Sequence, residues 1–379
     1  MKSLQVTTII HGYFPRVGGA ETQLRALVPH LRSQGIEMTI LTRRYDTGLP
    51  AYQKIDEAAV YRLPATGHKI VASLSFTISA FFRLLRLRPE LVHAHEFISP
   101  ATVALLAERF LQIPMVITSH RSGEIGDVQK MRRKLSGPMR LRALKKRVSK
   151  FIVISDEIWD ELTAIGVDED RLINITNGVD TKRFSPPSVD EKLVRRKEMG
   201  FSPDAQIAIF TGRLVPEKRL DLLISVWTKL RETHPKAELL ILGAGAEEES
   251  LKATAGDGIH FMGSTNDVLP FLQMANIFVL PSIAEGLSVA LLEAMSCELA
   301  PLLTDVGGAR EVVQHQENGW IIPPDDGEAL LEGLEAFFGN EKMLIERGQA
   351  ARQRVVSAFS IEIAAKKLAN LYFDLAKRK

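Results

Sequence analysis

The chain has 379 residues, 45% of them hydrophobic and 25% charged, with a formal net charge of +2. This composition matches an average soluble globular protein, and the length suits two domains better than one core. The single cysteine, Cys297, excludes an internal disulfide and fits a reducing compartment.

Two stretches are too short to direct the chain to or across a membrane. The apolar run Val6–Ile10 is interrupted by threonines, so we expect no signal peptide. The longest uncharged, mostly apolar stretch, Ile70–Phe82, has 13 residues, whereas about 20 are needed to span a bilayer. The expected location is the cytoplasm.

Strand-like apolar runs alternate with helical patterns from end to end. In the first half the predicted strands are Leu4–Ile10, Met38–Thr42, Leu91–His95, Met115–Thr118, Phe151–Ile154 and Leu172–Ile175. Leucines and a valine at helical spacing predict a helix over Ala20–Gln34. In the second half the predicted strands are Ile207–Thr211, Glu238–Leu242, His260–Met262, Ile277–Leu280, Ala300–Leu303 and Trp320–Ile322. This alternation predicts an α/β fold with two doubly wound, parallel sheets.

The break between the halves is Ser185-Pro-Pro-Ser188, followed by a charged stretch and Gly200-Phe-Ser-Pro203. We predict an N-terminal domain at 1–184, a linker at 185–204 and a C-terminal domain at 205–358, with a cleft between the domains. The last segment, 359–379, is an amphipathic helix. Its pattern leaves its domain open, and packing back on the N-terminal domain is one possibility.

Two cations follow the strand-like run Ile207–Thr211. In Gly212-Arg-Leu-Val-Pro-Glu-Lys218, Arg213 and Lys218 stand at the carboxyl end of that strand, where they suit a diphosphate. The alternative is an ordinary exposed basic loop. Lys218 precedes a helix, where a cation opposes the helix dipole unless it faces a ligand, so we favour function.

A second loop carries acids and small residues. In Glu285-Gly-Leu-Ser-Val-Ala-Leu-Leu-Glu293, small residues open a helix whose free N–H groups suit an anion. Glu285 and Glu293 would repel that anion, so we expect them to accept hydrogen bonds from neutral hydroxyls. For Glu293 the alternative is an acid in the first helical turn that stabilises its own helix. Cations for a diphosphate and acids for hydroxyls predict a nucleotide-sugar site.

Glycine pairs and one histidine also follow predicted strands. Gly18-Gly19 opens a helix and lets backbone N–H groups approach a phosphate, although a turn with positive φ explains the pair equally well. Gly243-Ala-Gly245 offers a second close approach. His120 ends Val116-Ile-Thr-Ser-His120, where an imidazole can contact a sugar hydroxyl, with a structural histidine as the alternative.

Other candidates are interpreted as structural. His93 and His95 share a strand face, but no third metal ligand is evident, so we favour a structural role and predict no metal site. Asp168-Glu-Asp170 lies in a predicted turn and is interpreted as solvated.

Charge and apolar residues gather in two segments of the first half. Residues 129–150 contain ten basic residues and no acid, while the rest of the chain carries 38 basic and 46 acidic residues. The segment Phe76–Arg88 is apolar with a cationic end. Together they suit anionic lipid headgroups, and a solvated face with a buried stripe is an equal alternative. Nucleic acid is not an expected partner, because the basic run lacks aromatic residues.

The chain resembles the retaining GT-B glycosyltransferases of group 1, or family 4. The resemblance covers nearly the whole sequence, and its order and spacing are specific. The matching segments are Pro15-Arg-Val-Gly-Gly-Ala-Glu21, His120, Asn177-Gly-Val-Asp180 with Phe184, Gly212-Arg-Leu-Val-Pro-Glu-Lys218, Gly243-Ala-Gly245, Glu285 to Met295 and Thr304-Asp-Val-Gly-Gly308. Two departures are Arg219, where glycine is common and where a charge would be added near the phosphates, and the segment Ser296–Pro301.

The resemblance implies roles for individual residues. It implies an acceptor-binding N-terminal domain and a donor-binding C-terminal domain, with no obligatory metal and no cofactor. Gly19 would offer its N–H to the donor phosphate beside Gly18, and His120 would lie beside the sugar. The other implied donor contacts are Arg213 and Lys218 on the diphosphate, Glu285, Leu287, Ser288 and Val289 on the sugar and phosphate, Glu293 on the ribose, and Met262 and Gly263 flanking the base, with Gly243 nearby.

The expected activity is transfer of a hexose, with retention, from a nucleotide-diphosphate sugar, first of all a UDP-sugar. The acceptor would be a saccharide or a lipid-linked molecule in cell-envelope or polysaccharide biosynthesis, and the enzyme could contact the inner face of the membrane peripherally. A GT-B nucleotide-sugar epimerase or sugar phosphorylase is the alternative within the fold. A non-catalytic membrane-associated scaffold is the alternative outside enzymes.

Overall fold

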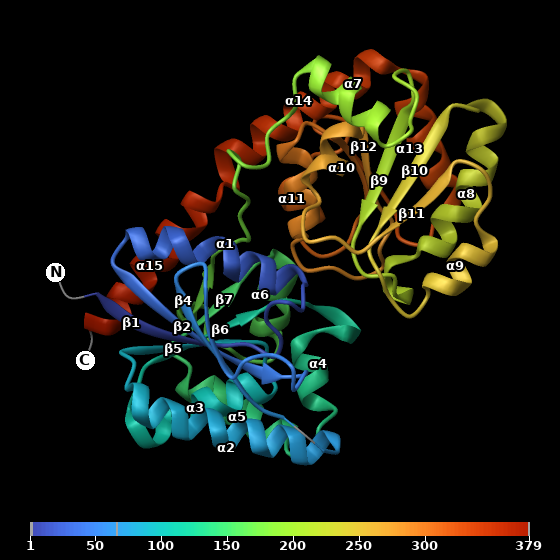
Figure 1. The fold of residues 1–379 in the computed structure, drawn as a ribbon. Coiled ribbons are helices and arrows are strands. Elements are labelled where there is room, and N and C mark those ends of the chain that lie inside the picture. The colour runs from blue at the N-terminus through green and yellow to red at the C-terminus, as the bar shows by residue number, and fades with distance from the viewer. Residues whose placement is uncertain (1–2, 66, 378–379) are drawn as a thin grey trace. The chain divides into compact units, whose positions relative to one another are not determined.

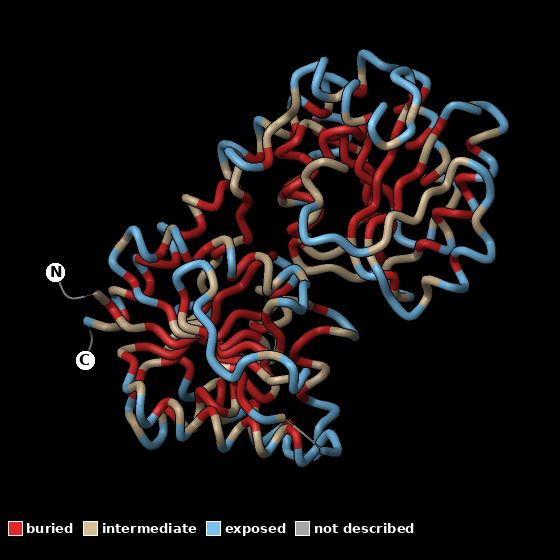
Figure 2. The backbone as a smooth tube through the Cα atoms, in the orientation of Figure 1, coloured by how far each residue is buried: buried red, intermediate tan, exposed pale blue. Residues whose placement is uncertain are grey.

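The computed structural model describes residues 3–65 and 67–377. They form two compact units (Figure 1). The first contains the chain up to Asn177 and again from Ile361 onward, and the second is Gly178–Ser360. In both units the buried residues are concentrated in the sheet strands and on the helix faces that cover them (Figure 2).

The first unit is built on an eight-stranded sheet with the order β3-β4-β2-β1-β5-β6-β7-β8. The strands are β1 (Leu4–Ile9), β2 (Ile36–Arg44), β3 (Tyr52–Ile55), β4 (Ala58–Pro64), β5 (Leu91–His95), β6 (Met115–Ser119), β7 (Lys150–Val153) and β8 (Leu172–Asn174). All neighbours are parallel except β3 and β4. The six predicted strands are therefore confirmed, with ends that shift by at most two residues.

The β3–β4 hairpin was not predicted. Its turn residues, Asp56 and Glu57, have φ values of 43° and 74°, so two acidic residues adopt the left-handed conformation that usually marks glycine or asparagine. β3 itself is polar and mostly exposed. Neither the turn nor the strand carried the usual sequence signal.

Helices cover both faces of the first sheet (Figure 1). They are α1 (Gly19–Ser33), α2 (Lys69–Leu87), α3 (Ser99–Leu111), α4 (Asp127–Arg132), α5 (Gly137–Arg147), α6 (Asp156–Ala164) and α15 (Ile361–Lys377). Figure 1 shows α2, α3 and α5 on one face and α1, α6 and α15 on the other.

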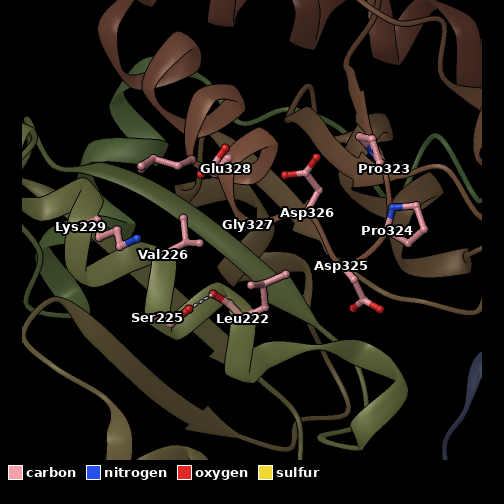
Figure 3. Close-up of a pocket in the computed structure, with 11 residues that line it drawn as sticks. Leu222, Ser225, Val226, Lys229, Pro323, Pro324, Asp325, Asp326, Gly327 and Glu328 are labelled. Atoms are coloured by element: carbon pink, nitrogen blue, oxygen red, sulfur yellow. Dashed lines mark hydrogen bonds between the residues drawn. The ribbon is translucent and has the colours of Figure 1, made fainter.

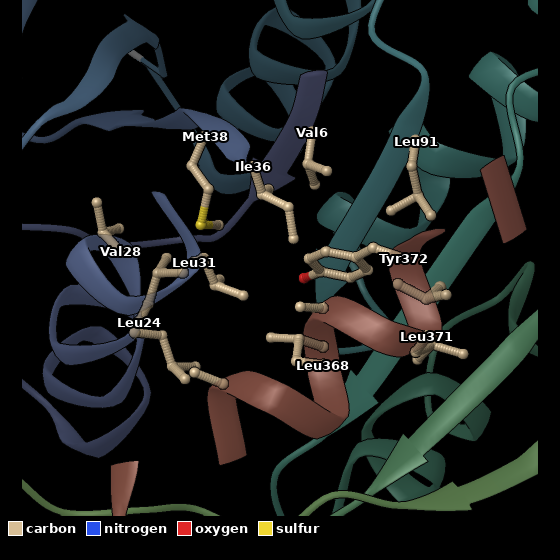
Figure 4. Packing of buried hydrophobic residues seen from close by; sticks show 14 of the residues in the cluster. Val6, Leu24, Val28, Leu31, Ile36, Met38, Leu91, Leu368, Leu371 and Tyr372 are labelled. Carbon is tan, nitrogen blue, oxygen red and sulfur yellow. The ribbon is translucent and has the colours of Figure 1, made fainter. Parts of the chain in front are cut away.

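The C-terminal helix belongs to the core of the first unit. Leu368 and Tyr372 of α15 pack with Leu24 and Leu31 of α1 and with Ile36 of β2 (Figure 4). Each of these side chains is at most 3% exposed. The structure thus resolves the question that the amphipathic pattern left open.

The second unit has a six-stranded, wholly parallel sheet with the order β11-β10-β9-β12-β13-β14. Its strands are β9 (Gln206–Thr211), β10 (Ala237–Leu242), β11 (Ile259–Gly263), β12 (Ile277–Leu280), β13 (Ala300–Thr304) and β14 (Trp320–Ile322). Its helices are α7 (Val189–Glu198), α8 (Leu220–Thr233), α9 (Glu248–Thr254), α10 (Leu269–Met274), α11 (Val289–Ser296), α12 (Ala309–Val312), α13 (Gly327–Gly339) and α14 (Glu341–Ala358). The predicted α/β architecture is confirmed in both units.

The predicted linker at 185–204 is a folded part of the second unit. It contains α7, which begins with a capping box between Ser188 and Glu191. Arg196 on this helix is buried and donates to the carbonyl oxygens of Met274 and Pro203 and to Asn276 Oδ1. The proline pair therefore marks the approach to a helix, and the boundary of the first unit falls after Asn177 instead of at 184.

Helix α2 is longer than the 13-residue apolar stretch predicted. Its 19 residues include an 18-residue window of mean hydropathy 1.6, so by length and composition it meets the requirement for crossing a membrane. No other helix among the described residues does so. Only 22% of that window is buried.

Candidate functional site

Two loops at the carboxyl ends of β9 and β12 bring the predicted diphosphate and sugar residues together. Lys218 lies in a short 3-10 helix after β9, and Glu285 lies in the loop before α11. The Lys218 ammonium donates to Glu285 Oε1, which also accepts from Ser282 Oγ at 2.7 Å. Backbone hydrogen bonding between Ile283 N and Glu217 O, 3.0 Å apart, joins the loops as well.

The Lys218–Glu285 ion pair is largely shielded from water, with side chains 13% and 14% exposed. Pairing cancels the negative charge that would otherwise make Glu285 repel a nearby phosphate. The ammonium keeps two further protons for another acceptor. The pair therefore presents a cation and a hydrogen-bond acceptor at one place.

The neighbouring arginines differ from each other. Arg213 is half exposed and contacts Glu217 at 3.4 Å, so most of its guanidinium remains accessible. Arg219 adopts a left-handed conformation, with φ of 51°, and its guanidinium pairs with Asp221 and Asp325. Two aspartates thus offset its charge, so Arg219 is less available to phosphates than its sequence position indicates.

Glycines hold these loops close to each other. A Cβ at Gly243 would overlap the carbonyl oxygen of Gly212, and one at Gly245 would overlap that of Leu214. A Cβ at Gly307 would meet the carbonyl oxygen of Gly286. Gly243 therefore has a packing reason to be glycine, and its contact with a donor remains a prediction.

The loop after Glu285 ends in the N-terminus of α11. Ser288 caps this helix, because its Oγ accepts from Leu291 N at 3.3 Å. Leu287 is buried and Val289 is the first helical residue. Glu285, Gly286 and Ser288 line a recess of only about 10 Å³, roughly the space of one water molecule, so this recess alone does not enclose a nucleotide sugar.

Glu293 is the fifth residue of α11 and lies beyond its first turn, so the alternative of a first-turn acid is wrong. The carboxyl is 8% exposed. Burial raises its pKa to about 7, while Arg183 opposes the rise and Asp267 adds to it. Arg183 itself pairs with Asp267 at 3.0 Å. Met262 and Gly263, predicted near the base, end β11.

A second, open recess lies elsewhere in the second unit. Its volume is about 460 Å³, and it lies between α8 and residues 323–328 (Figure 3). Asp325, Asp326 and Glu328 line it, with Lys229 as the basic side chain. None of the predicted donor residues lines it, and its acidic lining disfavours a diphosphate.

In the first unit, Gly18 and Gly19 form the N-terminus of α1. Gly18 is the N-cap with φ of −157°, so the alternative of a turn that needs positive φ is wrong for it. A Cβ on Gly18 would overlap Glu21 Oε2. The exposed Gly19 begins the helix, as the phosphate-approach interpretation requires.

His120 directly follows β6 and belongs to a row of three imidazoles. Its Nε2 lies 2.8 Å from His95 Nδ1, and the two rings differ by 13° in orientation. Burial lowers the pKa of His120 to about 4, although Glu96 opposes the shift. His120 is therefore a neutral imidazole at neutral pH.

The contacts of His93 fit the structural role that we favour for it. Its ring nitrogens lie 2.6 Å from Tyr372 Oη and 2.7 Å from Thr118 Oγ1. His95 differs, because it contacts His120 and its buried Nε2 has no hydrogen-bond partner among the residues that the structure describes. No group of three or more potential ligands suited to a metal occurs in the part of the chain that the structure describes.

Three further residues complete this region and were not predicted. Asp127 is 2% exposed, and its Oδ2 accepts from His120 N at 2.9 Å and from Ser119 Oγ at 3.1 Å. Burial raises the pKa of Asp127 to about 6, with a contribution from Glu96. Glu96 lies 2.8 Å from His11 Nδ1. Asp127 begins α4 and bonds the end of β6, and Glu96 and His11 follow different strands, so no known short motif signals these contacts.

The basic segment 129–150 is partly committed to the fold. Arg140 donates to Ile98 O at 2.8 Å, Lys145 donates to Ile165 O at 2.7 Å, and Lys150 donates to Asp170 O. Arg147 pairs with Glu108. The segment is therefore less available to an anionic surface than its composition indicates.

The predicted site residues thus form separate groups. Lys218, Glu285, Leu287 and Ser288 share one loop region of the second unit, and Arg213 lies in the same β9–α8 loop. Gly18, Gly19 and His120 belong to the first unit.

Two family models match this chain. The model for Glycosyltransferase Family 4 matches residues 17–183, and the model for Glycosyl transferases group 1 matches residues 192–354. A similar protein is the GDP-mannose-dependent monoacylated alpha-(1-6)-phosphatidylinositol monomannoside mannosyltransferase of Corynebacterium glutamicum. It is 27% identical over 384 residues, which cover 97% of this chain and 98% of that protein.

Solved structures share the fold. Sucrose-phosphate synthase from Thermosynechococcus elongatus has a TM-score of 0.84 at 20% identity, covering 99% of this chain and 100% of that one. Anabaena Alr3699/HepE in complex with UDP and glucose has a TM-score of 0.83 at 16% identity, covering 98% and 100%.

Proposed function

The chain belongs to the glycosyltransferases of group 1 and family 4, with the GT-B fold, and we propose that it transfers a hexose from a nucleotide-diphosphate sugar with retention of configuration. The shielded Lys218–Glu285 pair carries the proposal. It offers a cation for a leaving diphosphate and a carboxylate for a sugar hydroxyl. Arg213 adds a second, accessible cation in the same loop.

The proposed reaction breaks the bond between the anomeric carbon and the phosphate oxygen. Negative charge develops on the leaving diphosphate, and we assign its stabilisation to Lys218, Arg213 and the N-terminal amides of α11 after Ser288. The acceptor oxygen forms the new bond to the anomeric carbon, and the departing phosphate oxygen takes the acceptor proton. We assign His120 to the sugar, where its neutral ring can accept or donate one hydrogen bond.

A UDP-hexose is the proposed donor, as expected from the sequence. GDP-mannose is the second candidate, because the C. glutamicum relative is described as dependent on it. Glu293, whose raised pKa reflects burial, is assigned to the ribose hydroxyls, which are common to both donors. The identity of the base therefore depends on residues around Met262 and Gly263.

We propose a saccharide or lipid-linked acceptor in cell-envelope or polysaccharide biosynthesis. The name of the C. glutamicum relative describes a phosphatidylinositol-based acceptor, which supports a lipid. A peripheral position on the inner face of the cytoplasmic membrane would give the enzyme access to such a molecule.

The test is a panel of UDP-, GDP- and ADP-hexoses scored by thermal stabilisation, followed by product analysis with acceptor extract. A donor at about 100 times its Kd should add about 2.7 kcal/mol to the free energy of unfolding. NMR of the product's anomeric proton then reports retention. A donor consumed without acceptor to give an epimer would support the epimerase alternative, and stabilisation by no donor would support a non-catalytic scaffold.

A further inference from the structure

Helix α2 exposes an apolar face that the fold of the first unit does not use. Its inner face packs against the fold, because Ala72, Phe76, Ala80 and Leu84 are buried. Its outer face carries Ile70, Val71, Leu74, Ile78, Phe82 and Leu85, which are 36–67% exposed. Both sets recur at helical spacing, so α2 has an apolar face toward the fold and a second one on the surface.

An aromatic group extends this face onto α3. The Phe81 ring contacts the Phe82 ring at 6.3 Å and the Phe110 ring at 6.1 Å between centroids. Phe110 is 65% exposed at the end of α3. A contiguous apolar surface across two neighbouring helices is unusual for a soluble protein and marks an interaction site.

The charges around this face are mostly positive. Helix α2 contains no acidic residue, and Lys69, Arg86, Arg88 and Arg109 are exposed at its ends and beside it. The acid on α3, Glu108, is paired with Arg147 at 2.8 Å. An apolar helix bordered by cations matches a bilayer interface with anionic headgroups, where aromatic rings enter and cations contact phosphates.

We propose that the outer face of α2, with Phe110, lies in the interface of a membrane that contains anionic lipids. The inference rests on the peripheral location included in the proposed function, and it assigns the contact to α2 instead of the basic segment 129–150. Because the inner face of α2 is packed in the fold, the helix lies along the membrane without crossing it.

The experiment is co-sedimentation of the full chain with phosphatidylcholine vesicles, with and without about one third phosphatidylglycerol. The test variant is Ile70→Gln/Leu74→Gln/Ile78→Gln/Phe82→Gln, since glutamine suits an exposed helix. The matched control replaces four exposed apolar residues of the second unit, Val189→Gln/Val194→Gln/Ile345→Gln/Val356→Gln. We expect the α2 variant to bind anionic vesicles at least about tenfold more weakly, and the control to bind like wild type.

Charge variants identify which cations contribute. Arg86→Gln/Arg88→Gln should weaken binding to anionic vesicles more than Arg132→Gln/Arg133→Gln in the basic segment. The reverse order, wild-type binding by the α2 variant, or equal binding to neutral vesicles would overturn the proposal. So would a dimer in solution that the α2 substitutions abolish, because a second copy would then cover the face.

Donor stabilisation separates this proposal from the proposed function. A nucleotide sugar should stabilise the α2 variant as much as wild type, because α2 contains none of the assigned donor residues. Loss of vesicle binding with intact donor stabilisation supports the docking face. If wild-type protein bound vesicles through α2 but bound no nucleotide sugar, only the proposed function would be contradicted.

Discussion

The side chains at the carboxyl ends of the two sheets differ in how their charges are stabilised. In the second unit, Lys218 and Glu285 form a charged pair with accessible Arg213 nearby. In the first unit, His120 has a pKa of about 4 and Asp127 has a pKa of about 6, and burial is the main cause of both shifts. The second unit therefore keeps its charges by pairing them. In the first unit, burial disfavours the charged forms of His120 and Asp127, whereas the hydrogen bond with His11 lowers the pKa of Glu96 to about 2 against the effect of burial. We infer that the paired charges of the second unit neutralise the leaving group and that His120 positions the sugar.

The largest expected effect comes from separating Lys218 and Glu285. Lys218→Met should lower kcat/KM at least about 100-fold, because the leaving diphosphate loses its shielded cation. It should also cost about 3 kcal/mol of stability, since Glu285 is left as an unpaired, largely buried charge. Steady-state kinetics and denaturant unfolding measure the two effects.

The double variant Lys218→Met/Glu285→Gln sharpens this result. Removing the orphaned charge should restore most of the stability and none of the activity. Recovery of activity in the double variant would mean that Lys218 serves the fold and not the diphosphate.

The next effect concerns how Asp127 and His120 make the stability of the protein depend on pH. The pKa of Asp127 is raised from 3.8 to about 6, so its contribution to stability falls as the pH rises through this range. The pKa of His120 is lowered from 6.5 to about 4, so its contribution rises between those values. The two terms oppose each other in wild type.

Asp127→Asn should therefore steepen the increase in stability between about pH 4 and pH 6. The expected difference from wild type over this range is about 2 kcal/mol, since the whole shift corresponds to about 3 kcal/mol and about two thirds of it accrues between these pH values. Urea unfolding at a series of pH values measures it. Parallel curves for the variant and wild type would contradict a buried, protonatable Asp127.

A smaller effect is expected at His95, which we interpret as a positioning residue through its contact with His120. His95→Leu should lower kcat about tenfold with little change in KM, because ring orientation affects the reacting geometry more than donor affinity. His95→Gln, which keeps a hydrogen-bonding group, should be less impaired. An equal loss in both variants would point to packing instead of orientation.

The smallest effect is expected from Tyr372→Phe, which removes the 2.6 Å contact with His93. The loss should be about 1 kcal/mol of stability, as for a single hydrogen bond, with kcat unchanged. If kcat fell as well, His93 would be connected to the reacting region and its structural interpretation would fail.

The sequence predicted most of the fold because the strands of both sheets are short, apolar and separated by helical patterns. Strands Leu91–His95, Ile277–Leu280 and Trp320–Ile322 were predicted to the residue. The β3–β4 hairpin was not predicted, because Asp56 and Glu57 in its turn adopt the left-handed conformation, which acidic residues do not usually indicate. Proline signals also misplaced the boundary, because Pro186 and Pro187 precede a helix that packs in the second unit.

Candidate site residues were predictable where a charged side chain closely follows a predicted strand. Lys218 and Glu285 follow strand ends and are recognisable individually, but their ion pair joins residues 67 positions apart. Asp127 and Glu96 escaped because their partners, His120 and His11, lie on other elements. Of the two aspartates that pair with Arg219, Asp221 is close in sequence, but Asp325 is distant and its contact is not visible in the sequence. Long-range partners decide how each charge is used, and one sequence does not display them.

Helix α15 has a consequence for how the protein is made. Tyr372 and Leu368 fill the core beside α1 and β2, yet the ribosome makes them only after the whole second unit. Until then the N-terminal sheet has an open apolar groove. Nascent chains stalled before Ile361 should be sensitive to protease in their first 177 residues, and synthesis of α15 should end that sensitivity.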